Sequence, residues 1–192
     1  KALPENHPDL ASSYNNIGFV HNSMGEYSKA LEYYGKSLEI MKIGLPENHP
    51  SLATSYNNIG LVYHSMGEYS KALEYFEKDL EIMKKTLPEN HPDLATSYNN
   101  IGNVYNAMGE YSKALEYYEK SLEIMKKALP ANHPLLATSY NNIGWVYRNK
   151  TDYKKALDYF HRALDIFQSS LPSNHADIRN VKENIDFVKK KL

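Results

Sequence analysis

Histidine recurs along the sequence at a fixed interval, and histidine is a common side chain for binding metals and transferring protons. Five copies are spaced 42 residues apart: His7, His49, His91, His133 and His175. Zinc needs its nitrogen ligands about 2 Å from one ion. Equivalent residues on helices packed about 8–10 Å apart cannot converge to that distance. We therefore expect no metal site, and we expect these histidines to pack in loops at helix starts.

Other residue types used in catalysis form no recognisable site either. The sequence has no cysteine, which excludes a thiol nucleophile and thiolate zinc sites. It has 17 tyrosines, but these are copied at repeated positions, whereas a catalytic tyrosine would be singular. We find no Ser-His-Asp grouping, no glycine-rich phosphate loop and no isolated carboxylate pair. The sequence predicts a protein that is not an enzyme and uses no cofactor.

Charge and hydropathy restrict the partners further. Lys and Arg number 22 and Asp and Glu number 23, a balance that argues against nucleic-acid binding. No uninterrupted apolar run is long enough for a transmembrane helix, and the start KALPENHP has no signal-peptide core. We expect a cytoplasmic location. Basic residues concentrate after residue 147, which fits a solvated capping helix or a contact with an acidic partner or a lipid surface.

The chain is a tandem repeat with a period of 42 residues. The motif LPENHP begins at Leu3, Leu45 and Leu87, and residues 45–86 differ from residues 87–128 at seven of 42 positions. We divide the chain into one array of four repeats and a C-terminal capping helix, with approximate bounds 3–44, 45–86, 87–128, 129–170 and 171–192. Because the first three residues resemble the end of a repeat, we expect the array to be cut from a longer one.

Each repeat predicts two helices. Pro8 suits the first turn of a helix, where its missing N–H costs nothing. Asn6 or Asn90, with an aspartate three residues later, resembles a helix cap. Gly25 ends the first helix, and a second begins at about Glu26 with apolar residues at spacings of three and four. Neither helix can bury its apolar stripe alone, so the repeats must stack.

This pattern resembles the tetratricopeptide repeat, in which an aromatic, Leu-Gly and Tyr mark the first helix and Gly-x-Tyr, Ala, an aromatic and Ala mark the second. In the third repeat these positions are Tyr98, Ile101, Gly102, Tyr105, Gly109, Tyr111, Ala114, Tyr118 and Ser121. The 42-residue period, Asn-His-Pro opening and internal Asn-Asn pair are similar to the kinesin light chain subtype. The resemblance implies an all-α, right-handed superhelical solenoid of antiparallel helix pairs, acting as a scaffold or adaptor whose concave groove binds a protein or extended peptide.

Differences among the repeats fall on one face of the first helix, which lines the groove in that family. The frame is constant, with small residues that would let the two helices approach closely at Gly18, Gly60, Gly102 and Gly144. One variable column reads Phe19, Leu61, Asn103 and Trp145. Another, three residues later, reads Asn22, His64, Asn106 and Arg148. A constant frame with variable groove residues is the pattern expected of a protein that binds an extended peptide, because each repeat can contact a different part of it.

Asparagine pairs occupy the middle of every first helix, although asparagine is a poor helix former. They are Asn15 and Asn16, Asn57 and Asn58, Asn99 and Asn100, and Asn141 and Asn142. An amide both donates and accepts, so these residues predict a ladder that holds an extended peptide backbone. The alternative is that one asparagine of each pair bonds the helix ends of a neighbouring repeat.

Two further alternatives remain open from the sequence. Trp145 and Arg148 could contact an acidic residue beside a bulky apolar one in a ligand, or Trp145 could pack beneath the C-terminal helix against Val181 or Ile185 while Arg148 is merely solvated. The whole chain could instead be a structural array that associates end to end, engineered or recently duplicated, without a dedicated ligand.

Overall fold

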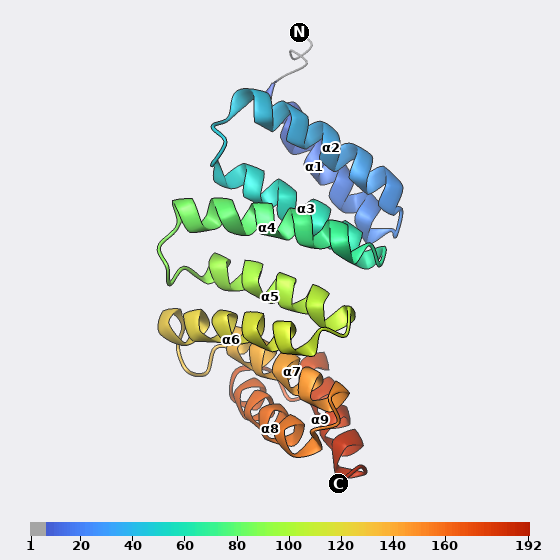
Figure 1. Cartoon of the computed structure of the whole chain (residues 1–192), viewed down its shortest axis with the longest axis vertical. Coiled ribbons are helices and arrows are strands. Elements are labelled where there is room, and N and C mark those ends of the chain that lie inside the picture. Colours follow the sequence, from blue (N-terminus) through green and yellow to red (C-terminus); the bar gives the residue numbers. More distant parts are fainter. Residues whose placement is uncertain (1–6) are drawn as a thin grey trace. The chain divides into compact units, whose positions relative to one another are not determined.

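The computed structural model of the protein describes residues 7–192, and these residues form α-helices and no strand (Figure 1). Leu3, Pro4 and Asn6, which were expected to open the first repeat, lie outside the described residues. The helices in the described part are α1 (Pro8–Ser23), α2 (Tyr27–Gly44), α3 (Pro50–Ser65), α4 (Tyr69–Thr86), α5 (Pro92–Ala107), α6 (Tyr111–Ala128), α7 (Pro134–Asn149), α8 (Tyr153–Ser170) and α9 (Ala176–Lys189). The predicted all-α class is confirmed.

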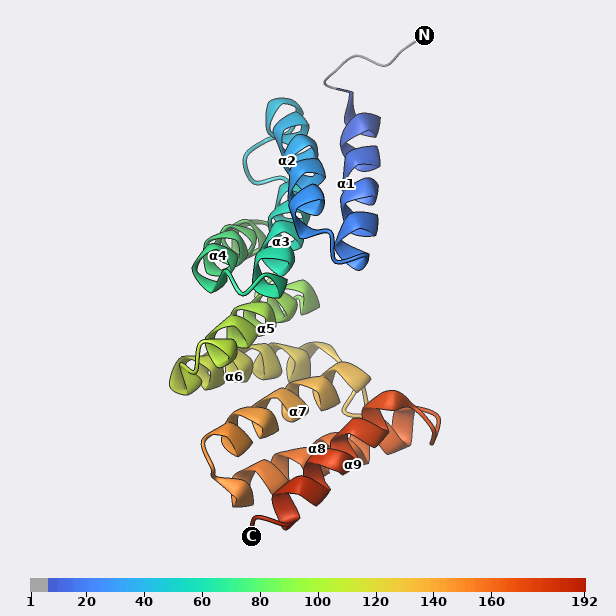
Figure 2. The same ribbon diagram turned by 90° about the vertical axis from the view of Figure 1, so that its right-hand side faces the viewer.

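The helices form antiparallel pairs, one pair for each repeat. The chain divides into two compact units: the first ends at Pro88 and holds α1 to α4, and the second begins at Glu89 and holds α5 to α9. Within the units α1 packs on α2, α3 on α4, α5 on α6 and α7 on α8, while α9 packs on α8 (Figures 1 and 2). Each pair also contacts the next pair of its own unit, through α2 with α3 and through α6 with α7.

Histidine, and not asparagine, caps the first helix of each repeat. The Nδ1 atom of His91 accepts a hydrogen bond from the backbone N–H of Asp93 at 3.2 Å. His7, His49, His133 and His175 cap their helices in the same way. The predicted cap at Asn90 is wrong because a residue before proline avoids the helical conformation, so His91 stays extended and the helix begins at Pro92, which has no N–H. The first available donor is therefore at Asp93, within reach of the imidazole of an extended His91. Among the described residues no group of acidic and histidine side chains could hold a metal ion.

A glycine in the first helix allows the two helices of a pair to approach closely, as predicted. A Cβ atom added to Gly102 would lie 2.7 Å from ring atoms of Tyr118, and one added to Gly144 would lie 2.7 Å from ring atoms of Phe160. Both rings are buried. Real Cβ atoms do not come so close to neighbouring carbons, so only glycine fits beneath the ring.

A buried hydroxyl joins the same two helices. Ser121 of α6 donates a hydrogen bond to the carbonyl of Ala95 in α5 at 2.7 Å, and Ser37 of α2 donates to Ala11 of α1 at 2.7 Å. Both serines are 0% exposed. A buried hydroxyl is stable only when it is hydrogen-bonded. This bond explains why Ser121 stands where the repeat family prefers alanine.

The turn between paired helices requires a left-handed residue. Gly25, Gly67 and Gly109 have φ values of 74° to 77°. At the same position in the fourth repeat the residue is Thr151, with φ of 59°. A β-branched residue is disfavoured in this conformation because its Cβ crowds the backbone.

We therefore predict that Thr151→Gly stabilises the protein. Removing the β-branched side chain relieves the left-handed backbone and should raise the free energy of unfolding by about 1 kcal/mol. Urea unfolding followed by circular dichroism measures the change. The reverse substitution at the matched turn, Gly109→Thr, should lower the free energy of unfolding. Equal stability of Thr151→Gly and the parent protein would contradict the assignment.

Candidate functional site

The sixteen predicted site residues all lie on α1, α3, α5 and α7, and we call this surface the groove face. None of the sixteen is buried, whereas Ile59, Gly60 and Val62 between them on α3 are buried. Phe19 is 63% exposed and Leu61 is 39% exposed. The faces of the helices are therefore separated as predicted, with the frame residues inside and the variable columns accessible.

The asparagine pairs bond one another from repeat to repeat. The Nδ2 atom of Asn58 donates to Oδ1 of Asn15 at 3.1 Å, joining α3 to α1. The Nδ2 atom of Asn142 donates to Oδ1 of Asn99 at 2.9 Å, joining α7 to α5. The alternative from the sequence was that one asparagine of each pair bonds a helix end of the neighbouring repeat. In these two bonds the partner is instead another asparagine side chain. An amide carries two N–H groups and two lone pairs, so each bond uses half of the donor or acceptor capacity involved.

The arrangement changes between α7 and α9. Asn184 lies 42 residues after Asn142, but its Oδ1 accepts a hydrogen bond from Nη1 of Arg148 at 2.9 Å. Oδ1 of Asn141 is buried and has no hydrogen-bond partner among the described residues. A buried acceptor of this kind is normally satisfied by water or by a ligand. The same holds for Oδ1 of Asn106 on α5.

Arg148 is held between two aromatic rings. Its guanidinium carbon lies 4.3 Å from the centroid of the Trp145 ring and 3.8 Å from that of Phe187 in α9. Trp145 is partly buried against the cluster that contains Val181 and Ile185. The packing of Trp145 beneath the C-terminal helix is therefore correct, whereas Arg148 is fixed and not merely solvated. The sequence interpretation missed Asn184 and Phe187, although each continues a groove column at the 42-residue interval.

A buried tyrosine of the frame supports the groove face of α5. The hydroxyl of Tyr118 on α6 donates to Oδ1 of Asn103 at 2.7 Å. Burial raises the pKa of this phenol, so it remains a donor at neutral pH. Asn103 is thereby oriented by a residue of the constant frame.

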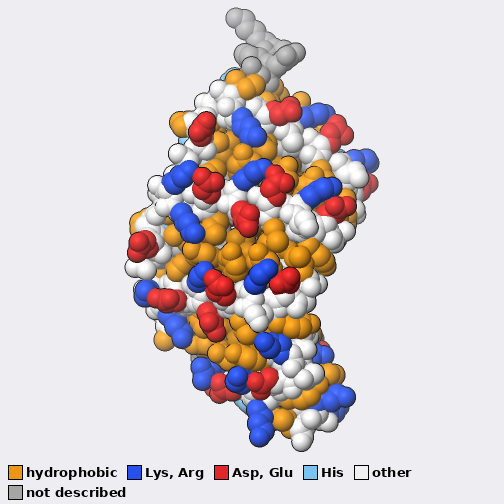
Figure 3. All heavy atoms as spheres, viewed as in Figure 1, with side chains coloured by type: hydrophobic (Ala, Val, Ile, Leu, Met, Phe, Trp, Pro, Cys, Tyr) orange, Lys and Arg blue, Asp and Glu red, His pale blue; other side chains and the backbone are white. Residues whose placement is uncertain are grey.

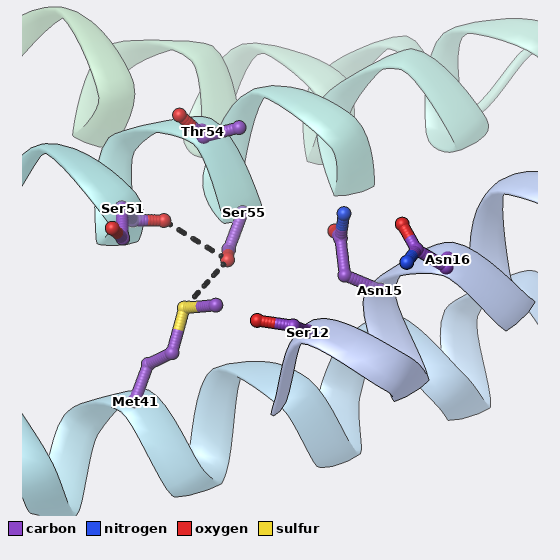
Figure 4. Close-up of a pocket in the computed structure, with 7 residues that line it drawn as sticks. All are labelled: Ser12, Asn15, Asn16, Met41, Ser51, Thr54 and Ser55. Carbon is purple, nitrogen blue, oxygen red and sulfur yellow. Dashed lines mark hydrogen bonds between the residues drawn. The ribbon is translucent and has the colours of Figure 1, made fainter. Parts of the chain in front are cut away.

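In the first unit the groove face contains a shallow pocket of about 240 Å³ between α1 and α3 (Figure 4). Met41 forms one wall. The single O–H of Ser55 has two acceptors within reach, Sδ of Met41 at 3.3 Å and the carbonyl oxygen of Ser51 at 3.1 Å. Figure 4 shows Asn15 pointing from α1 toward α3. The other lining residues are amides and alcohols: Ser12, Asn16 and Thr54.

The second helices carry most of the charge and pair it internally. Lys36 lies 2.6 Å from Glu32, and its ammonium group lies 5.1 Å from the centroid of the Tyr33 ring. Lys120 lies 2.6 Å from Glu116 and 5.2 Å from the ring of Tyr117. Figure 3 shows both charge signs interspersed with apolar bands on one face of the molecule. Among the sixteen groove-face residues, Arg148 is the one with a permanent charge.

The helices of the described residues include none that is both long enough and apolar enough to span a bilayer.

A comparison with curated proteins gave no match.

Solved structures of similar fold cover nearly the whole chain. A putative kinesin light chain from Podosopora anserina, with nearly identical TPR-like repeats, has a TM-score of 0.80 and 23% identity, over 96% of this chain and 88% of that one. BtubC (BKLC) from P. vanneervenii has a TM-score of 0.84 and 24% identity, over 96% of this chain and 73% of that one. The apo form of RapI has a TM-score of 0.80 and 24% identity, over 94% of this chain and 63% of that one. At these identities the likeness establishes the fold, that of a tetratricopeptide repeat solenoid.

The sequence itself matches the model of one family, the tetratricopeptide repeat, in three overlapping segments at residues 9–85, 51–127 and 93–169. These segments cover all four repeats and end before the C-terminal helix. They agree with the glycine-beneath-ring contact, the paired helices and the period of the groove columns. The chain belongs to the tetratricopeptide repeat family.

Proposed function

We propose that the protein is a non-catalytic scaffold that binds an extended peptide of a partner protein along the groove face. The observation that carries this proposal is the accessibility of the variable columns on a constant, buried frame. The amides of the face suit a peptide backbone, because an amide has two N–H groups and two lone pairs, and the inter-repeat bonds of Asn15, Asn58, Asn99 and Asn142 use only part of this capacity. We further propose that all four repeats act as one array, in an adaptor role in the cytoplasm.

We predict that Leu61→Glu abolishes binding of peptides selected from a phage-displayed library with this protein. Leu61 lies in a groove column, and a buried carboxylate would oppose the contact. Fluorescence anisotropy measures the affinity. Met66→Glu is the matched control, because Met66 belongs to the same repeat and is 40% exposed against 39% for Leu61, but lies outside both groove columns.

Loss of binding with Leu61→Glu and retention with Met66→Glu supports the proposal. Equal effects of the two substitutions would contradict it. A library that yields no peptide would favour the second candidate, an array without a dedicated ligand.

At the α7 end of the groove face we propose that the ligand carries an acidic residue beside a bulky apolar one. Among the described residues, the Arg148 guanidinium donates one hydrogen bond, from Nη1 to Oδ1 of Asn184. A guanidinium has five N–H donors in a planar fork, so others remain for a carboxylate of the ligand. Trp145, whose ring face lies against this guanidinium, is partly exposed and adds apolar surface beside it. The rings on both sides fix the guanidinium, which reduces the entropy lost on binding.

We predict that binding of such a peptide changes the emission of Trp145, the sole tryptophan of the sequence. Arg148→Ala should weaken binding about tenfold or more, since charge-assisted hydrogen bonds contribute about 1.5–3 kcal/mol. Arg148→Lys keeps the charge without the fork and should restore part of the affinity. Emission that stays unchanged at saturation with acidic peptides would show that Trp145 is only a packing residue.

One observation favours self-association as a second function. Ile17 and Val20 of α1 are 39% and 54% exposed, whereas Ile59 and Val62, their equivalents in α3, are 3% and 0% exposed where α2 packs on α3. Figure 2 shows α1 at the edge of its unit. Because the outer face of α9 is polar, contact between two α1 faces is favoured over end-to-end stacking. Light scattering at two concentrations tests for such dimers.

A further inference from the structure

The first unit contains an apolar slot beside the pocket of Figure 4. The slot has a volume of about 170 Å³ and lies between α1, the end of α2 and the start of α3. It shares Ser12, Met41 and Ser51 with the polar pocket, so the two cavities adjoin. Its other lining residues are mainly apolar: Pro8, Ala11, Ile40, Gly44 and Leu45.

Three of the residues that line the slot are smaller than their equivalents in the second unit. Ser12, Gly44 and Ser51 line it. At the equivalent positions 84 residues later, the second unit has larger side chains: Thr96, Ala128 and Leu135. The remaining five lining residues are identical in the two units. The difference between the units is therefore confined to side chains that would project into this space.

Gly44 is exposed, and a Cβ atom added to it would meet no atom within 4 Å, so the site tolerates an alanine. The backbone there is helical, and Ala128 occupies the same last helical position of α6. Glycine at this position is required neither by a left-handed backbone nor by a close helix contact.

The size and polarity of the slot select its occupant. Small-molecule sites usually measure about 300–1,000 Å³, whereas an apolar cavity of about 150 Å³ holds a benzene-sized group. The slot thus suits a single aliphatic side chain. Among residues 7–192, no charged side chain lines the slot or the adjoining pocket. Asn16 and Thr54 in that pocket offer an amide and a hydroxyl to the peptide groups on either side of such a residue.

We infer that the slot is an anchor site for a leucine-sized apolar side chain of the bound peptide, whose flanking peptide groups lie against Asn16 and Thr54. The inference rests on the proposed peptide-binding function and adds a residue preference to it. Because the second unit has Leu135 and Ala128 in place of Ser51 and Gly44, this preference belongs to the first unit alone.

Two small probes test the inference by NMR titration of the ¹⁵N-labelled full chain. N-acetyl-leucine N-methylamide carries the apolar side chain and two peptide groups, and N-acetyl-glycine N-methylamide carries the peptide groups alone. We expect the leucine probe to cause saturable shifts of the Gly44 and Ser51 amide signals. Its affinity should exceed that of the glycine probe about tenfold, as expected for burial of one aliphatic side chain.

The control variant combines Gly44→Ala with Ser51→Leu, which places two of the three larger side chains of the second unit in the slot. Circular dichroism and the amide signals of α4 should match those of the parent protein, since the chain already carries both residues at equivalent positions. We expect this variant to lose at least tenfold in affinity for the leucine probe and to leave the response to the glycine probe unchanged.

Absence of saturable shifts at Gly44 and Ser51, or equal binding of the leucine probe by the variant, would overturn the inference. Equal shifts at Asn16 and Thr54 with both probes would also overturn it, while leaving the proposed groove function intact. The groove function fails separately, if Leu61→Glu and Met66→Glu have the same effect on selected peptides.

Discussion

Each repeat depends on the contact between a glycine of its first helix and an aromatic ring of its second. The rings of Tyr34, Phe76, Tyr118 and Phe160 occupy the space that a Cβ atom on the glycine would need. This contact sets the distance and the rotation of the two helices, because any larger residue would push the ring aside. The rotation decides which side chains face outward. The groove columns are accessible because the glycine face of the same helix is turned inward.

Because of this constraint, the first and second helices of a repeat expose different kinds of polar side chain. The second helices pair lysine with glutamate four residues apart, as in Lys78 with Glu74, and the nearby ammonium group lowers the pKa of the Glu74 carboxyl. Such exposed pairs contribute little stability and mainly leave a solvated surface. The groove face has mainly amides, whose donors and acceptors can pair with peptide groups of any sequence. In the proposed function, discrimination among peptides falls to the few positions that vary between repeats.

The fold could be predicted because a 42-residue period, a repeated Gly-x-Tyr turn and helical apolar spacing all indicate the same structure. The site was predicted less completely, for physical reasons. The cap falls at His91 because Pro92 keeps the residue before it extended, which makes the histidine the last non-helical residue. The hydrogen bond between Asn58 and Asn15 joins residues that are 43 positions apart. Helix propensity describes each residue alone, so it could not predict this pairing. The packing of Arg148 between two rings needs Phe187 of α9. The 42-residue interval shows that Phe187 is equivalent to Trp145, but it does not show that its ring contacts Arg148.

Because the repeats have nearly the same sequence, a residue that differs between two repeats can be compared in almost identical surroundings. Ser51 and Leu135 have the same backbone surroundings, so their difference acts directly on the space above α2 or α6. Likewise Leu61 and Trp145 occupy one column, yet only the tryptophan has a cation beside it. The first unit therefore offers apolar and neutral contacts, and the second offers amides and a fixed guanidinium. Under the proposed function, a peptide segment bound by the first unit is expected to carry an apolar residue, and a segment bound by the second unit is expected to carry an acidic one.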